Sequence, residues 1–218
     1  MLTGLMALHL SGNPLRSVPA AIGDLSRLTY LGLVNSQLDS VPNEIGLLTA
    51  LEYLDIGKNL FTTLPAGIGG MTALILLDVS HGTLTDMPAE LGQLGSLVFL
   101  MLYGNELRSP PTALPLLTNL SVLDLGWNML DSFPPLASLS RLEYLHLQSN
   151  RLSAVPANVF DGLHHLRVLS LGNNDLSGNV VEVGDFMQSG SVGHNAIIVL
   201  QVACGDRNMP QHATPRLS

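Results

Sequence analysis

Three aspartates recur at equivalent places along the chain, and their type and spacing come closest to a chemical site. Asp55, Asp78 and Asp124 each follow a leucine in a short leucine-rich segment, and the first two are 23 residues apart. If these segments are neighbouring strands, the carboxylates of Asp55 and Asp78 lie within roughly 5–6 Å of each other. We expect an acidic spot that binds a basic side chain, with Lys58 as a nearby counter-charge. The alternative is that aspartate is simply common at this position.

Aromatic side chains recur at the same segments as these aspartates. Tyrosine and tryptophan supply rigid contact area with a polar tip, and they dominate the hot spots of protein interfaces. Alternatively, the tyrosines pack against one another and only stabilise a sheet. We expect a surface for a protein or peptide partner, in which His146 also takes part. The predicted partner-binding residues are Tyr30, Tyr53, Asp55, Asp78, Phe99, Met101, Tyr103, Asp124, Trp127, Tyr144 and His146.

Catalytic and metal-binding patterns are missing from the sequence. No serine lies in a GxSxG motif, and neither a GxxxxGK[ST] loop nor a dinucleotide-binding fingerprint is present. His164 and His165 adjoin, whereas His9 and His146 lie several repeats apart, so the histidines do not have metal-ligand spacing. We therefore expect no enzyme activity, no cofactor and no metal ion.

Charge and cysteine content narrow the partners and the compartment. The chain has 9 lysines and arginines against 17 acidic residues, a net charge of −8, which argues against nucleic acid and anionic membranes. The single cysteine, Cys204, excludes an intramolecular disulfide framework. The apolar stretch around Ala196–Leu200 is too short to span a bilayer. We expect a cytoplasmic monomer that is not inserted in a membrane, with an extracellular location as the alternative.

A leucine pattern that returns every 23 residues must position these side chains. LMALHLSGN at 5–13 is followed by seven further copies, the last being LRVLSLGNN at 166–174. Leucines at the first, fourth and sixth positions alternate with variable residues, which is typical of a short strand with one buried face. The asparagine after each strand is expected to bond the backbone of the neighbouring coil. Ser36 and Gly82 replace this asparagine, so we expect weaker local order there.

The second half of each copy predicts a short helix. VPAAIGDLSRL at 18–28 and VPNEIGLLTAL at 41–51 place apolar residues three and six positions after a proline, a spacing that suits a short α- or 3₁₀-helix ending at glycine. Strands are about 4.8 Å apart and the helical side is wider, so the stack must curve. The sequence thus predicts an α/β solenoid, a right-handed horseshoe with parallel strands on its concave face and short helices on its convex face.

These motifs resemble the leucine-rich repeat family, in particular its LPxxIGxLxxL class. Plant intracellular Ras-group-related proteins and animal Ras-signalling scaffolds carry that class, and the resemblance implies a non-enzymatic signalling scaffold that binds a partner on its concave face. Three copies depart from the class, at SPPTALPLL (109–117), FPPLASLS (133–140) and VPANVFDGLHHL (155–166). The last is similar to repeats of extracellular members.

We expect three parts along the chain. Residues 1–178 form the repeat domain, with about eight repeats of 22–24 residues that start inside a coil. We expect a fragment of a longer array, and the alternative is that Met1 starts a chain whose first coil is left open. Residues 179–204 are a candidate capping segment or else have no settled structure, and 205–218 are expected to be a disordered tail. The sequon at Asn119 and the copy at 155–166 leave a receptor ectodomain open. A regulatory array of a larger enzyme is a third alternative.

Overall fold

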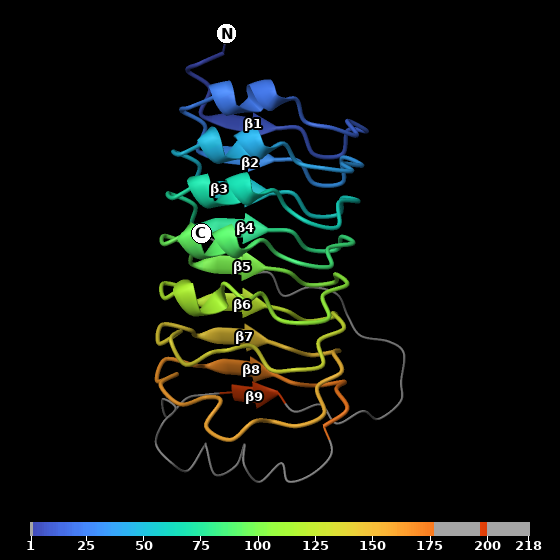
Figure 1. Cartoon of the computed structure of the whole chain (residues 1–218), viewed down its shortest axis with the longest axis vertical. Helices are drawn as coiled ribbons and strands as arrows, with labels where there is room; N and C mark the ends of the chain where they lie inside the picture. Colours follow the sequence, from blue (N-terminus) through green and yellow to red (C-terminus); the bar gives the residue numbers. More distant parts are fainter. Residues whose placement is uncertain (1, 177–196, 200–218) are drawn as a thin grey trace.

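A stack of flat coils makes up the part of the chain that the structure, a computed structural model, describes, namely residues 2–176 and 197–199 (Figure 1). Each coil contributes one three-residue strand, and the strands form one parallel sheet in sequence order. The strands are β1 (Ala7–His9), β2 (Tyr30–Gly32), β3 (Tyr53–Asp55), β4 (Leu76–Asp78), β5 (Phe99–Met101), β6 (Val122–Asp124), β7 (Tyr144–His146), β8 (Val168–Ser170) and β9 (Ile197–Val199).

The leucine pattern fixes which face of each strand is buried. The middle residue of β3, β4 and β5 is a fully buried leucine, whereas the residues on either side of it are partly exposed. The register pairs each residue with the one a repeat further on, so that Leu54 lies beside Leu77 and Leu77 beside Leu100. The leucines therefore stack into one continuous core, and the predicted parallel sheet is confirmed.

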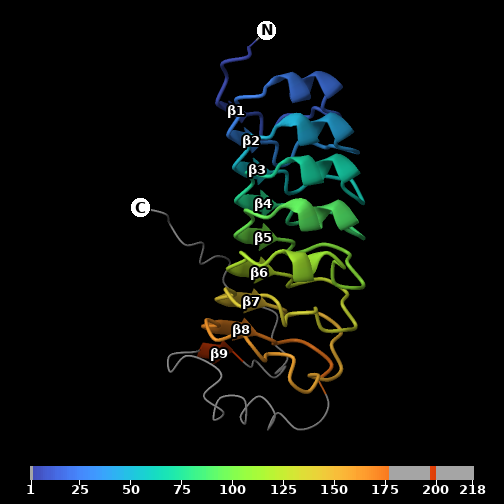
Figure 2. The same ribbon diagram turned by 60° about the vertical axis from the view of Figure 1, so that its left-hand side comes forward.

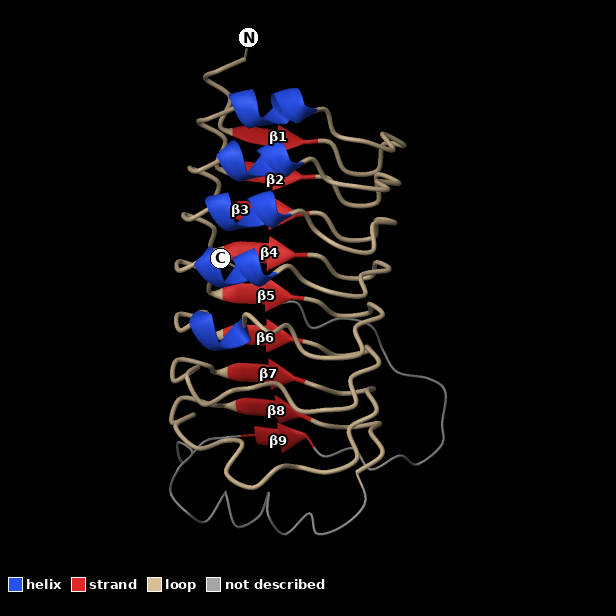
Figure 3. Cartoon of the chain, viewed as in Figure 1, coloured by secondary structure: helices blue, strands red, loops and turns tan. Residues whose placement is uncertain are grey.

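Short 3₁₀-helices form the opposite side of the stack from the sheet (Figure 2). The first four each follow a proline in extended conformation, which directs the chain into the helix. Figure 3 shows that helices accompany the coils before β6, and the described residues after β6 contain none. The helices are η1 (Ala20–Asp24), η2 (Asn43–Leu47), η3 (Ala66–Gly70), η4 (Ala89–Gln93) and η5 (Leu114–Leu116).

Glycine recurs at the same place in these helices, but it does not end the helix as the sequence predicts. Gly46 is the fourth of five residues in η2 and does not end it. A Cβ atom at Gly46 would collide with the carbonyl of Gly67 in η3, and one at Gly67 with the carbonyl of Asn43. Glycine is required here because the backbones of neighbouring helices touch.

A ladder of buried asparagines joins successive coils, as the sequence predicts. The side chain of Asn105 donates to the carbonyls of Val79 and Leu102, and its Oδ1 accepts from the N–H of Leu84. Asn13 differs from this prediction, because it is exposed and bonds only to carbonyls of its own coil. Among the described residues, its amide bonds the carbonyls of Leu10 and Ser11.

The coil that carries Ser36 in place of asparagine is held by its neighbour. Asn59 Oδ1 accepts from the backbone N–H groups of both Ser36 and Leu38, at 3.0 Å each. Ser36 is fully buried, and its hydroxyl donates only to the Val34 carbonyl, at 3.4 Å. The expected weaker order at Ser36 and Gly82 stays a prediction.

The C-terminal part of the chain is described only at β9. This strand continues the sheet by pairing in parallel with β8, so that Val168 lies beside Ile197. The rest of the candidate capping segment 179–204 and the tail 205–218 lie outside the described residues. Within 2–176 and 197–199, no helix is long and apolar enough to cross a membrane.

Candidate interaction face

The strand-lined side of the stack, which we call the concave face, presents two columns of side chains. Both columns follow from the register, because the first and third residues of β1 to β8 point away from the leucine core. Column 1 consists of Ala7, Tyr30, Tyr53, Leu76, Phe99, Val122, Tyr144 and Val168. Column 2 consists of His9, Gly32, Asp55, Asp78, Met101, Asp124, His146 and Ser170.

Asp55 and Asp78 are neighbours in column 2, as the sequence predicts. Burial raises the pKa of Asp55, and the negative charge of Asp78 raises it further, to about 6. A hydrogen bond from the Gly57 N–H and the charge of Lys58 act in the opposite direction. This part of the face therefore holds two carboxylates that repel each other at neutral pH.

Asp124 lies further along column 2 in a more enclosed position. Burial raises its pKa, and the repulsion from Asp78 adds to this effect. The N–H of Gly126 donates to its Oδ1 at 2.9 Å, and the charges of His146 and His81 also favour the carboxylate. The strands thus bring all three predicted aspartates into one column, with Met101 between Asp78 and Asp124.

Tyr103 and Trp127 follow the strands and extend the concave face at its strand-exit edge. Their ring centroids are 6.4 Å apart, and the ring of His81 meets Tyr103 edge-on at 4.9 Å. Burial and the charge of Asp124 raise the pKa of the Tyr103 hydroxyl, so this ring lies in the field of the carboxylate. We call His81, Tyr103 and Trp127 the aromatic corner, in which 57% of the surface of Trp127 is exposed.

Tyr30 lies close to Asp55, the first aspartate of column 2. The hydroxyl of Tyr30 lies over Gly32, where an added Cβ atom would be 3.0 Å from it. Burial and the charge of Asp55 raise the pKa of Tyr30. The ring of His9 packs on Tyr30 with centroids 4.4 Å apart. Tyr30 therefore lies near Asp55 in the way that Tyr103 lies near Asp124.

The structure places the remaining predicted residues on the same face but at different distances from this centre. Tyr53 and Phe99 lie in column 1, with Leu76 between them. Tyr144 and His146 lie on β7, one strand beyond Asp124, and His146 Nδ1 is 3.2 Å from the Ser170 hydroxyl. All eleven predicted residues thus share one face, while their role in binding stays a prediction.

His81 and Gln148, which are not among the predicted residues, also follow strands at the edge of this face. The signal for His81 was present, because it lies two repeats before Trp127 at the equivalent position. Gln148 follows β7, and its Oε1 is buried without a hydrogen-bond partner among the residues that the structure describes. Only the folded geometry shows that unpaired acceptor.

Trp127 belongs to a series of residues whose backbone is left-handed. Each follows a strand at the same place in its coil, and φ is 53° at Trp127. Glycine adopts this region freely, whereas a bulky residue does so at an energetic cost. The equivalent residues are Gly12, Asn35, Lys58, His81, Gly104, Trp127, Ser149 and Asn173.

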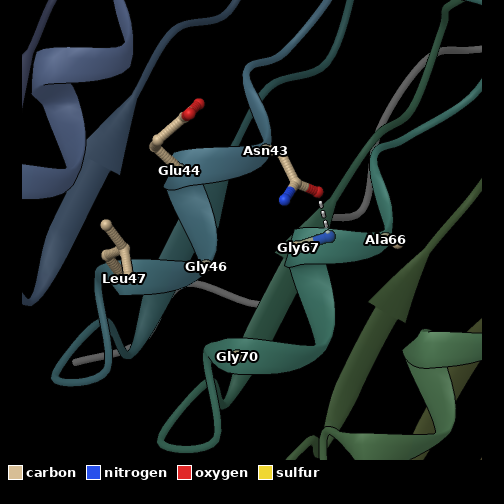
Figure 4. Close-up of a pocket in the computed structure, with 7 residues that line it drawn as sticks. All are labelled: Asn43, Glu44, Gly46, Leu47, Ala66, Gly67 and Gly70. Carbon is tan, nitrogen blue, oxygen red and sulfur yellow. Dashed lines mark hydrogen bonds between the residues drawn. The ribbon is translucent and has the colours of Figure 1, made fainter.

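The convex side carries an open hollow of about 310 Å³ between η2 and η3 (Figure 4). Asn43 Oδ1 accepts from the Gly67 N–H at 2.7 Å and joins the two helices there. Glu44 is the only ionisable residue in the lining. The remaining lining residues are Asn43, Gly46, Leu47, Ala66, Gly67 and Gly70. Across the described residues, no group of three or more potential metal ligands gathers.

Known protein families match the repeated part of the chain. Residues 5–134, well over half of the chain, match the family described as a leucine-rich repeat region, and residues 140–182 match a second leucine-rich repeat description. The chain belongs to the leucine-rich repeat family. The predicted family and the horseshoe fold are confirmed, and leucine-rich repeat domains are generally modules of protein interaction.

Solved leucine-rich repeat structures resemble the chain closely in shape. A leucine-rich repeat protein of Leptospira interrogans is 29% identical, with a TM-score of 0.70 over 92% of this chain and 55% of its own. The ectodomain of the Arabidopsis thaliana receptor kinase GASSHO1/SCHENGEN3, in complex with Casparian strip integrity factor 2, is 26% identical. Its TM-score is 0.77 over 92% of this chain and 24% of its own. A TLR13–ssRNA13 complex gives 27% identity and a TM-score of 0.74, over 82% of this chain and 26% of its own.

A local similarity links one stretch of the leucine-rich repeats to a curated protein. Mouse podocan is 55% identical over 42 residues, which cover 19% of this chain and 7% of podocan. The chain thus spans a small part of podocan and between about a quarter and three fifths of the structures that it resembles. These likenesses establish the repeat architecture.

Proposed function

We propose that this chain is a non-enzymatic interaction module whose concave face binds a protein or peptide partner, as part of a cytoplasmic signalling scaffold. The observation that carries the proposal is the aromatic corner beside Asp124. Trp127 is 57% exposed there and contacts Tyr103, whose ring lies near the carboxylate. An exposed tryptophan next to a partly buried tyrosine and a carboxylate is typical of an interface hot spot.

The backbone of Trp127 supports a binding role over a structural one. A bulky residue at φ 53° is strained, and Gly12 and Gly104 occupy the same place in other coils without that strain. The leucine core does not include Trp127. An exposed, strained side chain outside the core contributes little to the fold, so a role in recognition is the better explanation.

A fragment of a receptor ectodomain is the second candidate function. The likeness to the GASSHO1/SCHENGEN3 ectodomain, which is bound to Casparian strip integrity factor 2, favours it. The sequon at Asn119 supports the receptor less well, because the side-chain amide of Asn119 already forms hydrogen bonds within the fold. Asn119 Nδ2 donates to the Gly95 carbonyl at 2.7 Å, and Arg141 donates to its Oδ1 at 2.7 Å. Secretory expression followed by mass analysis of Asn119 separates the candidates, and full glycosylation supports the receptor.

The proposed function is tested with ligands selected for the whole chain from a random-peptide display library. Tyr103→Ala and Phe99→Ala are expected to weaken the selected ligands by more than about 1 kcal/mol while the far-ultraviolet circular dichroism stays unchanged. Leu47→Ser is the matched control, because Leu47 is 59% exposed on the convex side. Unchanged affinity in both concave variants, or loss of affinity in Leu47→Ser alone, contradicts the proposal.

A further inference from the structure

The order of side chains in column 2 gives the concave face a pattern that a ligand can match. Asp55 and Asp78 are adjacent, Met101 follows, and Asp124 comes next. Neighbouring strands are about 4.8 Å apart, so Asp124 lies about 12 Å from the midpoint of the Asp55–Asp78 pair. Met101 lies about 7 Å from the same midpoint. The face thus alternates charge, apolar surface and charge along the stack.

An extended peptide laid along this column has the same spacing. Its residues rise about 3.3 Å each, and side chains on one face recur every two residues, or about 6.6 Å. Residues i and i+4 are therefore about 13 Å apart, which matches the distance from the acidic pair to Asp124. Residue i+2 falls opposite Met101.

The negative charges of the three aspartates on the concave face favour a basic ligand. Among residues 2–176 and 197–199, the three aspartates form no ion pair, and the ion pair present there joins Arg167 to Glu143. Each aspartate accepts one hydrogen bond from a backbone N–H two residues further on, as in Ser80 to Asp78 at 2.8 Å. Lys58, on the strand-exit side of β3, acts on Asp55 without contacting it as an ion pair. A cationic side chain of a ligand would therefore give these aspartates the ion-pair partner that the fold does not supply.

Aromatic side chains lie near the aspartates at both ends of this acidic stretch of column 2 and favour a cationic ligand there. Tyr30 lies near Asp55, and Tyr103, whose ring is 6.4 Å from that of Trp127, lies near Asp124. A guanidinium or ammonium group placed there meets a carboxylate and the face of a ring together, and cation–π attraction adds to the ion pair. Arginine fits the Asp124 end best, because its planar group stacks on aromatic rings.

We propose that the concave face binds an extended basic segment that carries lysine or arginine at positions i and i+4 and an apolar residue at i+2. This inference rests on the proposed function and specifies its partner. Residue i lies against Asp55 and Asp78, residue i+2 against Met101, and residue i+4 against Asp124 and the aromatic corner. The partner is a protein segment without stable helix, since a helix would place i and i+4 only about 6 Å apart.

The experiment measures the binding of labelled synthetic peptides to the whole chain by fluorescence anisotropy at physiological salt. The matched probe contains Lys-Ala-Leu-Ala-Arg between Gly-Ser flanks. The spacing control has the same residues in the order Lys-Arg-Ala-Ala-Leu, and the charge control has glutamate at both basic positions. We expect the matched probe to bind at least fivefold more tightly than the spacing control and the charge control not to bind. Equal affinity for the matched probe and the spacing control overturns the proposal.

Substitutions in the chain assign the binding to the column. Asp124→Asn and Asp78→Asn are expected to weaken the matched probe at least fivefold, whereas Asp39→Asn, at an exposed site away from columns 1 and 2, leaves it unchanged. Asparagine keeps the oxygen that accepts the backbone N–H, so the fold is retained. Equal losses in all three variants indicate attraction by net charge alone and overturn the proposal.

The outcome separates this inference from the proposed function. If the display library yields ligands that lack basic residues and are weakened by Tyr103→Ala, the inference fails and the proposed function stands. If the selected ligands are insensitive to Tyr103→Ala and to Phe99→Ala, the proposed function fails as well.

Discussion

Asp55 and Asp78 lie side by side on β3 and β4, and their carboxylates repel each other across the sheet. Burial and this repulsion raise the pKa of Asp55 to about 6. Each aspartate accepts a hydrogen bond from a backbone N–H, and the amide oxygen of an asparagine could accept the same bond. The fold therefore does not need two negative charges at these positions, and one asparagine would remove the repulsion. The pair therefore makes the fold less stable at neutral pH and leaves negative charge available to a ligand.

The stability of the chain is expected to fall as the pH rises from about 4 to about 6. The unfolded chain loses the proton of Asp55 near 3.8, whereas the folded chain keeps it until about 6. Between these values the folded state binds more protons, so the free energy of unfolding decreases with pH and levels off above 6. Urea denaturation of the whole chain at pH 4, 5, 6 and 7, compared with Asp55→Asn, measures this difference.

Asp78→Asn is expected to lower the pKa of Asp55 and to raise the free energy of unfolding at pH 7. We expect a gain of about 1 kcal/mol, because Asp55 is half-exposed and solvent screens the interaction. The gain should vanish at pH 3, where Asp55 is protonated in the folded chain. Carboxyl-carbon NMR titration of Asp55 measures the pKa, and Asp39→Asn is the control that should leave it unchanged. A pKa of Asp55 that does not move in Asp78→Asn contradicts the account.

Trp127→Gly separates binding from folding. The change relieves the left-handed strain at φ 53° but makes the unfolded chain more flexible, so the free energy of unfolding should change by less than about 1 kcal/mol. Affinity for a selected ligand should fall by more than fivefold. Ser149→Gly, at the equivalent place one coil on, is the control and should leave binding intact. A large loss of stability in Trp127→Gly would assign the tryptophan a structural role.

Asn105→Ala is expected to lower the free energy of unfolding by about 2–3 kcal/mol. The change leaves the N–H of Leu84 and the carbonyls of Val79 and Leu102 without the amide that they share. Asn13→Ala is the matched control, and its exposed amide should be worth less than about 1 kcal/mol. Chemical denaturation of both variants gives the comparison, and similar losses would show that burial of the amide is not what matters.

Gly46→Ala is expected to destabilise the chain by about 2–3 kcal/mol, because the new methyl group collides with the Gly67 carbonyl of η3. Gly95→Ala is the control, since no atom lies within 4 Å of a Cβ atom there. Thermal unfolding of the two variants measures the difference. Equal melting temperatures would mean that η2 and η3 separate easily.

The leucine period predicted the parallel sheet and the face on which each strand residue lies. Leu54, Leu77 and Leu100 align because equal repeats place equal residues side by side, so the columns that contain Tyr53 and Asp55 follow from counting along the sequence. The asparagine ladder was predictable for the same reason. The family assignment followed from these regularities.

Features that depend on contact between coils could not be read from one repeat. The role of Gly46 appears only when η3 lies against η2, and the exposure of Asn13 appears only in the folded structure. The left-handed backbone at Trp127 and the buried acceptor of Gln148 depend on the local path of the chain after each strand. The residue types at the variable positions predict which chemical groups the face carries. Their burial, backbone conformation and contacts are visible only in the folded structure.

The most direct test of the central claim is the hydrogen-exchange footprint of a selected peptide ligand on the whole chain. If the concave face is the interaction surface, slower exchange should appear at residues 99–104 and 122–128, which contain Tyr103, Asp124 and Trp127. The segments 43–47 and 66–70 on the convex side should exchange at the same rate with and without ligand. Protection of those convex segments, with no change at 99–104 and 122–128, would contradict the account.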